Sequence, residues 1–317
     1  MSVAGAPAGP ALGRAAAPEA GPGGPASGAR SGRLTPYFLL LPLGLALVVF
    51  FLLPLLSQLN SSLTSGGLEE GYRFDWAVGN YVEVWLDYWP QFLRSFLYAA
   101  AATVLALLIA YPLAYTIAFK VGDGWRPVLL VLIVAPFFTS FLIRTLAWTT
   151  VLADDGWVVA ALRGSGVLFL TDGVGLTTDG RVLATPLAVI LGLTYNFLPF
   201  MTLPLYASLE KQDRSLLQAS GDLYASAWDG FWKITWPLSL PGVVSGTLLT
   251  FIPATGDYVN ATFLGSMRES MAGNVIDALF LRVRDYNHAA ALSISLMVAI
   301  VALVVHYVRR AGTEDLV

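Results

Sequence analysis

The chain has 317 residues, of which 56% are hydrophobic and 12% charged, and its mean hydropathy is +0.67. That charged fraction is about half that of a typical soluble domain, which indicates a protein with several membrane spans. The net charge of −3 and the lack of a basic stripe give no sign of nucleic-acid binding. The absence of cysteine excludes disulfides and thiolate chemistry, and His288 and His306 are not spaced as a metal-ligand pair.

Residues 1–34 are rich in alanine, glycine and proline, and their only cations are Arg14, Arg30 and Arg33. Such a segment cannot bury a hydrophobic core, so we expect a disordered cytoplasmic tail. It has no apolar central run, which argues against a cleavable signal peptide.

Apolar runs follow, each near the roughly 20 residues that a helix needs to cross about 30 Å of hydrocarbon. They are 37–59, 95–119, 127–152, 182–206, 240–264 and 287–308. The spans must be helical, because each backbone group left unpaired in lipid costs several kcal/mol. The sequence therefore predicts an all-α, polytopic membrane protein with six transmembrane helices, in which residues 35–312 form the membrane domain.

An even number of spans places both termini on one side, and the positive charges indicate which side. The loops on the side of the termini hold all the lysines, whereas the opposite loops hold most of the acids. We therefore expect both termini and the 207–237 loop in the cytoplasm. The external segments, roughly 60–93, 153–181 and 265–286, contain tryptophans and tyrosines that suit either headgroup anchoring or contact with a partner domain.

Motifs of catalysis are absent. The chain has no G-x-x-x-x-G-K-[ST] phosphate loop, no H-E-x-x-H and no G-x-S-x-G. We expect no catalytic residue, metal or cofactor on this chain, so any energy input would come from an ion gradient or from another subunit.

The segment 207–242 interrupts the apolar runs with charged residues that alternate with leucine, tryptophan and phenylalanine, and it returns to apolar sequence through Pro237 and Pro241. Its length and amphipathic texture predict a docking element. It resembles the signature loop of ABC-importer permeases, E-A-A-x-x-x-G followed by a hydrophobe and L-P. The matching residues here run from Gln218 to Ser226 and continue through Phe231 to Gly242.

In detail, the chain resembles permeases of the spermidine/putrescine type over about residues 35–312. Further matching stretches are 80–81, 111–114, 144–148, 198–201, 253–259 and 263–265. The resemblance implies the type I importer permease fold and a loop of two short helices that sits in a cleft of a cytoplasmic ATPase. The coupling residues it implies are Gln218, Ala219, Ser220, Asp222, Leu223, Tyr224 and Phe231.

Three positions depart from the motif: Gln218 replaces glutamate, Ser220 replaces alanine, and Tyr224 replaces the glycine at the turn. A tyrosine would be strained at positive φ. We therefore expect a turn of ordinary φ at Tyr224, or a turn shifted to Gly221 or Gly230.

The resemblance also implies partners: two cytoplasmic ATP-binding subunits, a second homologous permease and an extracytoplasmic solute-binding protein, all at a bacterial plasma (inner) membrane. ATP would bind only to the partner ATPases. The expected solute is a polyamine, and the alternatives within the same machinery are an aminoalkylphosphonate, an opine or ferric iron.

Intramembrane polar residues are candidates for the substrate path. Asp257 is a carboxylate at membrane depth, suited to pair with a substrate ammonium, and Tyr258 offers a ring for cation–π contact. The alternative is a structural pairing of Asp257, for example with Arg144. Tyr195 and Asn196 could line the path or form helix–helix hydrogen bonds.

Two other classes of protein stay open. An ion-coupled secondary transporter would show internal repeats and paired intramembrane acids, and we see neither. A non-transporting scaffold is disfavoured by the intramembrane charge and by prolines within the spans.

Overall fold

The computed structural model describes residues 35–311 except 68, 70 and 223, so the tail 1–34 lies outside the described residues. The chain divides into two compact units, Met1–Leu53 and Pro54–Val317. In the first unit, helix α1 (Thr35–Leu47) continues as the π-helical segment η1 (Val48–Leu52). Both elements are apolar and uncharged, as a membrane span requires.

The second unit begins within α2 (Leu53–Ser62), and among the described residues its strands form one short hairpin while its other regular elements are helical. That hairpin pairs β1 (Thr64–Ser65) antiparallel with β2 (Arg73–Phe74). The following elements are α3 (Gly79–Tyr115), η2 (Thr116–Lys120), α4 (Arg126–Val134), η3 (Ala135–Phe138), α5 (Phe141–Val151), α6 (Trp157–Gly164), α7 (Val167–Gly173) and α8 (Pro186–Glu210). After them come α9 (Arg214–Asp222), α10 (Ala227–Gly230), η4 (Phe231–Thr235), α11 (Trp236–Thr255), α12 (Val259–Leu264), η5 (Met267–Glu269), α13 (Ala272–Asp277), η6 (Ala278–Val283) and α14 (Tyr286–Ala311).

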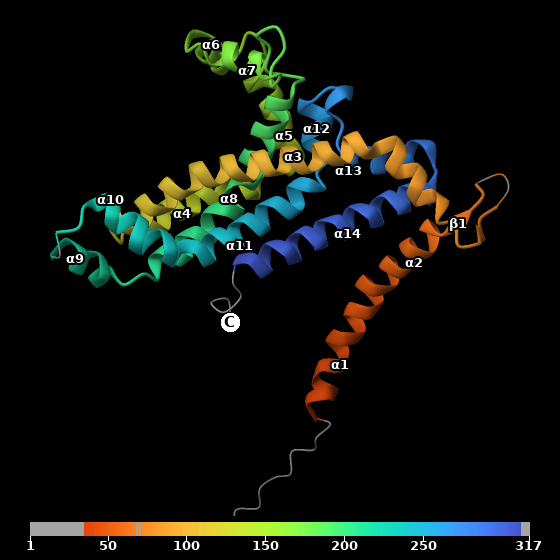
Figure 1. The fold of residues 1–317 in the computed structure, drawn as a ribbon, viewed down its shortest axis with the longest axis horizontal. Coiled ribbons are helices and arrows are strands. Elements are labelled where there is room, and N and C mark those ends of the chain that lie inside the picture. The colour runs from red at the N-terminus through yellow and green to blue at the C-terminus, as the bar shows by residue number, and fades with distance from the viewer. Residues whose placement is uncertain (1–34, 68, 70, 223, 312–317) are drawn as a thin grey trace, which may run out of the picture. The chain divides into compact units, whose positions relative to one another are not determined.

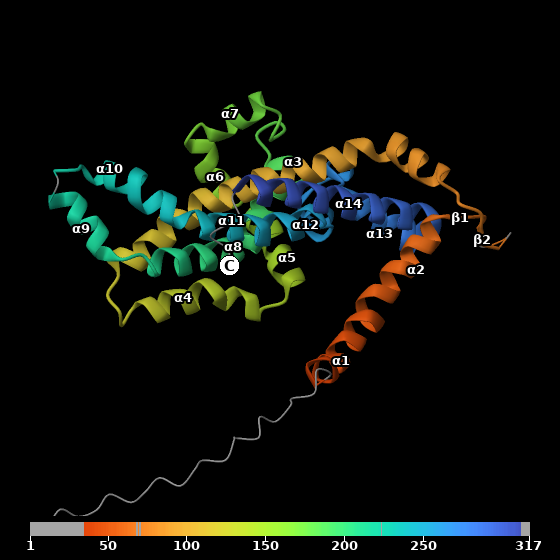
Figure 2. The same ribbon diagram turned by 60° about the horizontal axis from the view of Figure 1, so that its bottom comes forward.

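Helices α3, α8, α11 and α14 lie side by side and form the centre of this unit (Figures 1 and 2). On α3, Ala106, Ala110 and Ala114 recur every fourth residue and are completely buried. Small side chains at this spacing let helix backbones approach closely, which is how helices associate in lipid.

Two glycines of α11 serve the same purpose against α8. A Cβ added to Gly242 would lie 2.5 Å from the Cβ of Ser208, and one added to Gly246 would lie 2.9 Å from the Sδ of Met201. Gly242 and Gly246 are four residues apart and therefore share one helix face. This small-x-x-x-small pattern fixes the crossing of α8 and α11.

Among the described residues, five helical segments are long and apolar enough to cross a membrane. They are Leu40–Ser62, Gly79–Lys120, Pro186–Glu210, Ala227–Thr255 and Tyr286–Arg310. A sixth span is reached only if the bent pair Arg126–Phe138 and Phe141–Val151 counts as one, and these two helices meet at 96°. The chain is thus an all-α, multi-pass membrane protein, as the sequence predicts.

The structure differs from the predicted spans in three places. The run 127–152 is broken after Phe138, because Pro136 lies in a 3₁₀ turn and Thr139 is extended. The run 240–264 is divided by the non-helical Gly256–Tyr258, so Asp257 lies between α11 and α12 and not within one continuous helix. The run 95–119 belongs to a helix that already begins at Gly79.

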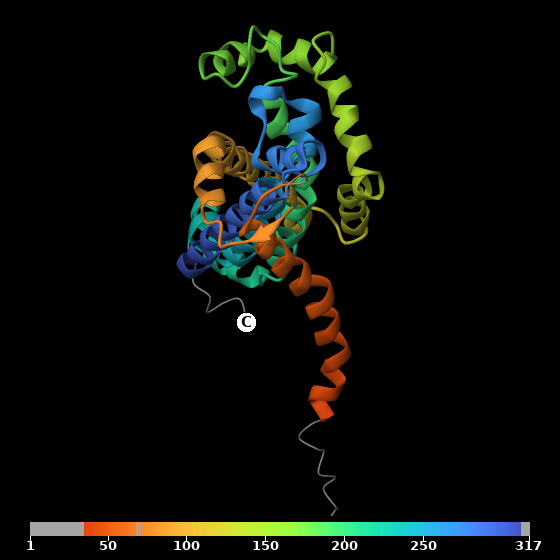
Figure 3. The same ribbon diagram turned by 90° about the vertical axis from the view of Figure 1, so that its right-hand side faces the viewer.

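The short helices gather at the ends of the unit. Helices α9 and α10 lie at one end of α3, whereas α13 and the β1–β2 hairpin lie near the other (Figure 1). Helices α6 and α7 lie beyond α5, away from the central helices (Figures 1 and 3). A cluster that includes Leu152, Val159, Leu168 and Leu264 forms the core beneath them.

Candidate functional site

The segment 213–235 contains α9, α10 and η4, and its first helix is started by an aspartate. The Oδ1 atom of Asp213 accepts a hydrogen bond from the backbone N–H of Ser215 at 2.9 Å, and this bond lowers the pKa of Asp213. A carboxylate in this position satisfies one of the free N–H groups at a helix start. Helix α9 then packs on α10, because Leu217 and Ser220 lie against Gly230.

The turn between α9 and α10 is made by Tyr224, which has a φ of +60°. Its N–H donates to the carbonyl of Gly221 and the N–H of Ala225 donates to that of Ser220, both at 3.0 Å. These two bonds form a Schellman motif, in which the left-handed residue is usually glycine. Our expectation of an ordinary φ, or of a turn shifted to Gly221 or Gly230, is therefore wrong.

The physical reason is that the side chain of Tyr224 is 99% exposed and meets no steric obstacle. The left-handed conformation still costs a non-glycine residue roughly 1–2 kcal/mol. The two backbone hydrogen bonds of the Schellman motif offset part of that cost.

Helix α10 begins with a side-chain cap at Ser226. Its Oγ accepts a hydrogen bond from the N–H of Asp229 at 3.1 Å and donates to the Oδ2 of the same residue at 2.6 Å. The other carboxylate oxygen of Asp229 lies 2.8 Å from the Nζ of Lys233, one turn later. The capping and the ion pair together hold α10 and η4 as one helical segment.

Phe231 connects this segment to the centre of the unit. Its ring meets Tyr111 of α3 edge to face at a centroid distance of 5.7 Å and lies 6.5 Å from the ring of Trp236. Tyr111 is buried and hydrogen-bonds the hydroxyl of Ser239 at 2.9 Å. Phe231 thus faces the protein, whereas Trp228 is 70% exposed.

The other predicted coupling residues lie along α9. Gln218, Ala219 and Asp222 are exposed, and Asp222 forms no ion pair or hydrogen bond with the described residues. Leu223 lies outside the described residues. The exposed face of α9 and its following turn are therefore open to a partner, while Ser220 and Phe231 hold the segment together.

Two of the substrate-path candidates, Asn196 and Asp257, belong to a hydrogen-bonded junction of α5, α8 and α12. The Nδ2 of Asn196 donates to the Oγ1 of Thr145 at 3.1 Å and to the Oδ1 of Asn260 at 3.0 Å. Asn260 in turn donates from its backbone N–H and its Nδ2 to the Oδ1 of Asp257, at 2.8 and 3.1 Å. Room for Asn260 is left by Gly192, whose added Cβ would lie 2.6 Å from the Asn260 Oδ1.

In this junction Asp257 is 8% exposed, and Asn260 and Asn196 are completely or almost completely buried. The structure does not join Asp257 to Arg144, since no ion pair between them exists among the described residues. The guanidinium of Arg144 lies over the ring of Phe137 instead, 5.0 Å from its centroid.

The two tyrosine candidates have different surroundings. Tyr195 meets the indole of Trp148 edge to face at 5.3 Å. Tyr258 is 47% exposed, and its carbonyl accepts a hydrogen bond from the Nδ2 of Asn274 at 2.8 Å. Of the four predicted path residues, Asp257 and Asn196 are therefore brought into one network, and the Tyr258 ring is the accessible one.

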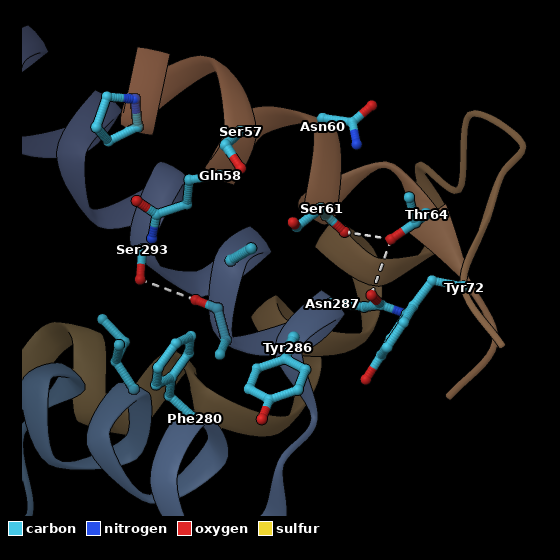
Figure 4. Close-up of a pocket in the computed structure, with 14 residues that line it drawn as sticks. Ser57, Gln58, Asn60, Ser61, Thr64, Tyr72, Phe280, Tyr286, Asn287 and Ser293 are labelled. Carbon is cyan, nitrogen blue, oxygen red and sulfur yellow. Dashed lines mark hydrogen bonds between the residues drawn. The ribbon is translucent and has the colours of Figure 1, made fainter. Parts of the chain in front are cut away.

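A pocket of about 680 Å³ between α2 and α14 is a feature that sequence reasoning missed (Figure 4). Its polar lining is uncharged and includes Gln58, Asn60 and Asn287, and Asn287 accepts a hydrogen bond from Thr64 at 2.8 Å. Among the described residues, its lining includes no carboxylate that could serve as counter-charge for a cation.

His288 also has a role that its sequence spacing does not reveal. Its Nδ1 lies 2.7 Å from Asp285 and its Nε2 lies 2.9 Å from Glu83 of α3. The imidazole therefore joins the start of α14 to the first turns of α3. No group of three or more acidic or histidine side chains in the described part of the chain could hold a metal ion.

The architecture defines a multi-pass membrane protein with an amphipathic segment docked at one end of its central helices. Comparison with solved structures identifies this fold. A chain of a bacterial ABC transporter involved in the import of the acidic polysaccharide alginate has a TM-score of 0.62 at 17% identity, covering 88% of this chain and 95% of that one. A chain of a bacterial alginate ABC transporter in complex with alginate pentasaccharide-bound periplasmic protein has a TM-score of 0.58 at 18% identity, covering 88% of this chain and 94% of that one. The chain therefore has the fold of ABC-importer permeases, which confirms the predicted fold class.

Sequence comparison gives closer relatives. The chain is 39% identical over 190 residues to the spermidine/putrescine transport system permease protein PotB of Salmonella typhimurium, covering 60% of this chain and 63% of the relative. It is 39% identical over 184 residues to PotB of Escherichia coli, covering 58% and 64%. The predicted resemblance to spermidine/putrescine-type permeases is thus confirmed.

A third relative is the inner membrane ABC transporter permease protein YdcU of Escherichia coli, which is 32% identical over 194 residues, covering 58% of this chain and 59% of that protein. The chain spans slightly less than two thirds of the length of these curated relatives. No family model matches the chain.

Proposed function

We propose that the chain is the membrane-spanning permease subunit of an ATP-binding-cassette importer, and that its solute is a small cation of the spermidine/putrescine type. The observation that carries this proposal is the 39% identity over 190 residues to proteins named as spermidine/putrescine permeases. The shared fold supports the transporter class, although those solved neighbours serve alginate, an acidic polysaccharide.

In this proposal the segment 213–235 lies in the cytoplasm and couples the permease to an ATPase. Its exposed residues, Gln218, Ala219, Asp222 and Tyr224, would contact the ATPase, while Phe231 passes the motion to Tyr111 of α3. A rigid aromatic contact transmits displacement because packed side chains compress very little. This chain supplies no catalytic group, and ATP binds and is hydrolysed on the partner.

The remaining partners of the proposal are a second permease of similar fold, a pair of ATPase subunits and an extracytoplasmic solute-binding protein. With the 213–235 segment in the cytoplasm, both termini are also cytoplasmic. Helices α6 and α7 then face the extracytoplasmic side, from which the solute arrives. The membrane is the bacterial inner membrane, consistent with the name of the relative YdcU.

For the solute path we propose Asp257 and Tyr258. The Oδ1 of Asp257 is held by Asn260, whereas its Oδ2 accepts no hydrogen bond from the described residues and would meet a substrate ammonium. The half-exposed ring of Tyr258 would add cation–π contact. Asn196 and Tyr195 would support this site from α8.

The proposal is tested by purifying the protein from its native membrane and reconstituting the purified assembly into liposomes. We expect ATPase subunits to co-purify and labelled putrescine or spermidine to accumulate only when ATP and the binding protein are supplied. A single chain that transports without an ATPase would contradict the proposal. ATP-dependent uptake of a phosphonate, opine or ferric iron with no polyamine uptake would replace the solute and keep the machinery.

A further inference from the structure

The turn between α9 and α10 carries two features that are unfavourable within the chain itself. Tyr224 occupies the left-handed position of the turn, with a φ of +60°, where glycine would be free of strain. Asp222 lies in the last turn of α9, where the partial negative charge of the helix end disfavours an acidic side chain.

Among the described residues, no hydrogen bond, ion pair or ring contact of either side chain offsets its cost. The phenol of Tyr224 is 99% exposed and stacks on no described ring, and Asp222 is exposed without an ion pair among the described residues. The neighbouring helix behaves differently, since Asp229 is capped by Ser226 and paired with Lys233. The unsatisfied groups are therefore confined to the turn.

We propose that Tyr224 and Asp222 form a two-point docking tip, in which the phenol enters an apolar pocket of the ATPase and the carboxylate pairs with a lysine or arginine at the rim of that pocket. This inference rests on the proposed function. Tyrosine is enriched among residues that dominate binding, because it buries a large rigid surface with few rotatable bonds. The Schellman hydrogen bonds fix the backbone at Tyr224, so this backbone is already ordered before the ATPase binds and less entropy is lost on binding.

A consequence is partner selection. An ATPase whose surface fits a glycine at this turn has no cavity for a phenol, so Tyr224 excludes that ATPase by steric conflict. Asp222 favours an ATPase that has a lysine or arginine at the rim of the pocket. Selection by a clash together with an attraction is a general way to discriminate between similar partners.

The test uses the full chain, together with the permease that co-purifies with it, in lipid nanodiscs, and the ATPase subunits isolated from the same wild-type assembly as the probe. The Kd is measured for wild type, Tyr224→Gly and Asp222→Asn. We expect Tyr224→Gly to weaken binding at least about tenfold, as hot-spot truncations do. Asp222→Asn should weaken binding by a few-fold and reduce its dependence on salt concentration.

Trp76→Gly is the matched control, because Trp76 is also an exposed aromatic residue at positive φ, +55°, but lies next to the β1–β2 hairpin at the other end of the unit. It should leave the Kd unchanged. Tyr224→Asn provides a second variant if the glycine variant folds poorly, since asparagine tolerates this backbone.

Equal binding by wild type, Tyr224→Gly and Tyr224→Asn would overturn the docking tip and leave the proposed function intact. Failure of the wild-type assembly to contain or bind any ATPase would overturn the proposed function itself. Loss of binding in the control as well as in Tyr224→Gly would also overturn the tip, because the effect would then not belong to this turn.

Discussion

The α5–α8–α12 junction and the segment 213–235 use polar side chains in opposite ways. At the junction, Asn196, Asn260 and Asp257 turn toward one another and are almost fully buried. At the turn of the 213–235 segment, the side chains of Asp222 and Tyr224 are exposed and form no hydrogen bond, ion pair or ring contact with the described residues.

This difference distinguishes polar side chains that stabilise the fold from polar side chains that are left exposed and unpaired. Buried polar groups in a membrane protein must be paired by neighbouring helices, so the junction fixes how three helices meet. Exposed groups that carry an intrinsic cost have no such explanation, and under the proposed function we expect a partner to cover them.

The largest loss of stability is expected from adding a bulky side chain at the α5–α8–α12 junction. Gly192→Val would place its Cβ 2.3 Å from the Cδ1 of Leu264 and 2.6 Å from the Oδ1 of Asn260, both in completely buried residues. We expect destabilisation of roughly 3 kcal/mol, the upper part of the range for overpacking. The measurement is the folded fraction against temperature, followed by size-exclusion chromatography in detergent.

The matched control for that variant lies at the docking tip. Gly221 is on α9, and an added Cβ there meets nothing within 4 Å. Gly221→Ala should stabilise the helix by roughly 0.5–1 kcal/mol. Equal destabilisation by both variants would remove the distinction between the two regions.

Phe231→Ala tests the connection between the docking segment and the central helices. Loss of the contacts with Tyr111 and Trp236 should destabilise the protein by about 2 kcal/mol, less than a fully buried phenylalanine would. ATP-dependent uptake should fall further than the folded fraction does, because the segment would no longer move α3. Trp228→Ala, at a 70% exposed position, should leave the stability nearly unchanged, and a loss of stability as large as that of Phe231→Ala would contradict this assignment.

Asp257→Asn tests whether the junction also serves the solute. The amide oxygen can still accept from Asn260, so we expect a stability change of about 1 kcal/mol, the size of one weakened hydrogen bond. Uptake of a cationic solute should show a raised KM. An unchanged KM with the same folded fraction would assign Asp257 to structure alone.

The smallest effect is expected from Ser220→Ala. Ser220 donates from its Oγ to the carbonyl of Leu217 at 2.8 Å within its own helix and packs near Gly230. Its replacement by the alanine of the ABC-permease motif should change stability by no more than about 0.5 kcal/mol, as measured by thermal unfolding. A larger loss would mean that the two helices of the docking segment depend on this hydroxyl.

Hydropathy was sufficient to predict the helical class, because lipid demands long apolar helices. It did not predict the breaks at Thr139 and at 256–258, since these depend on local backbone conformation within sequences that stay apolar. The resemblance to ABC permeases predicted two short helices in the 207–237 loop, which the structure contains as α9 and α10. The φ of Tyr224 was mispredicted, because the sequence could not show that its side chain would have free space.

The sequence also could not predict which residues far apart in the chain would pair with each other. The hydrogen bond from Asn196 to Asn260 joins residues 64 positions apart, and His288 meets Glu83 across 205 positions. Only the tertiary fold brings such residues together, so a single sequence gives candidates for polar sites without their pairing.

The continuous helical segment Gly79–Lys120 has 42 residues and is therefore about 63 Å long. Measured along its axis, this segment is about twice as long as the roughly 30 Å of hydrocarbon, and Pro90 and Pro112 lie within it. One end touches Phe231 through Tyr111, and the other holds His288 through Glu83. Tyr111 and Glu83 thus lie on one continuous helical backbone. Under the proposed function, a displacement of Phe231 would be carried along α3 toward the end that meets His288.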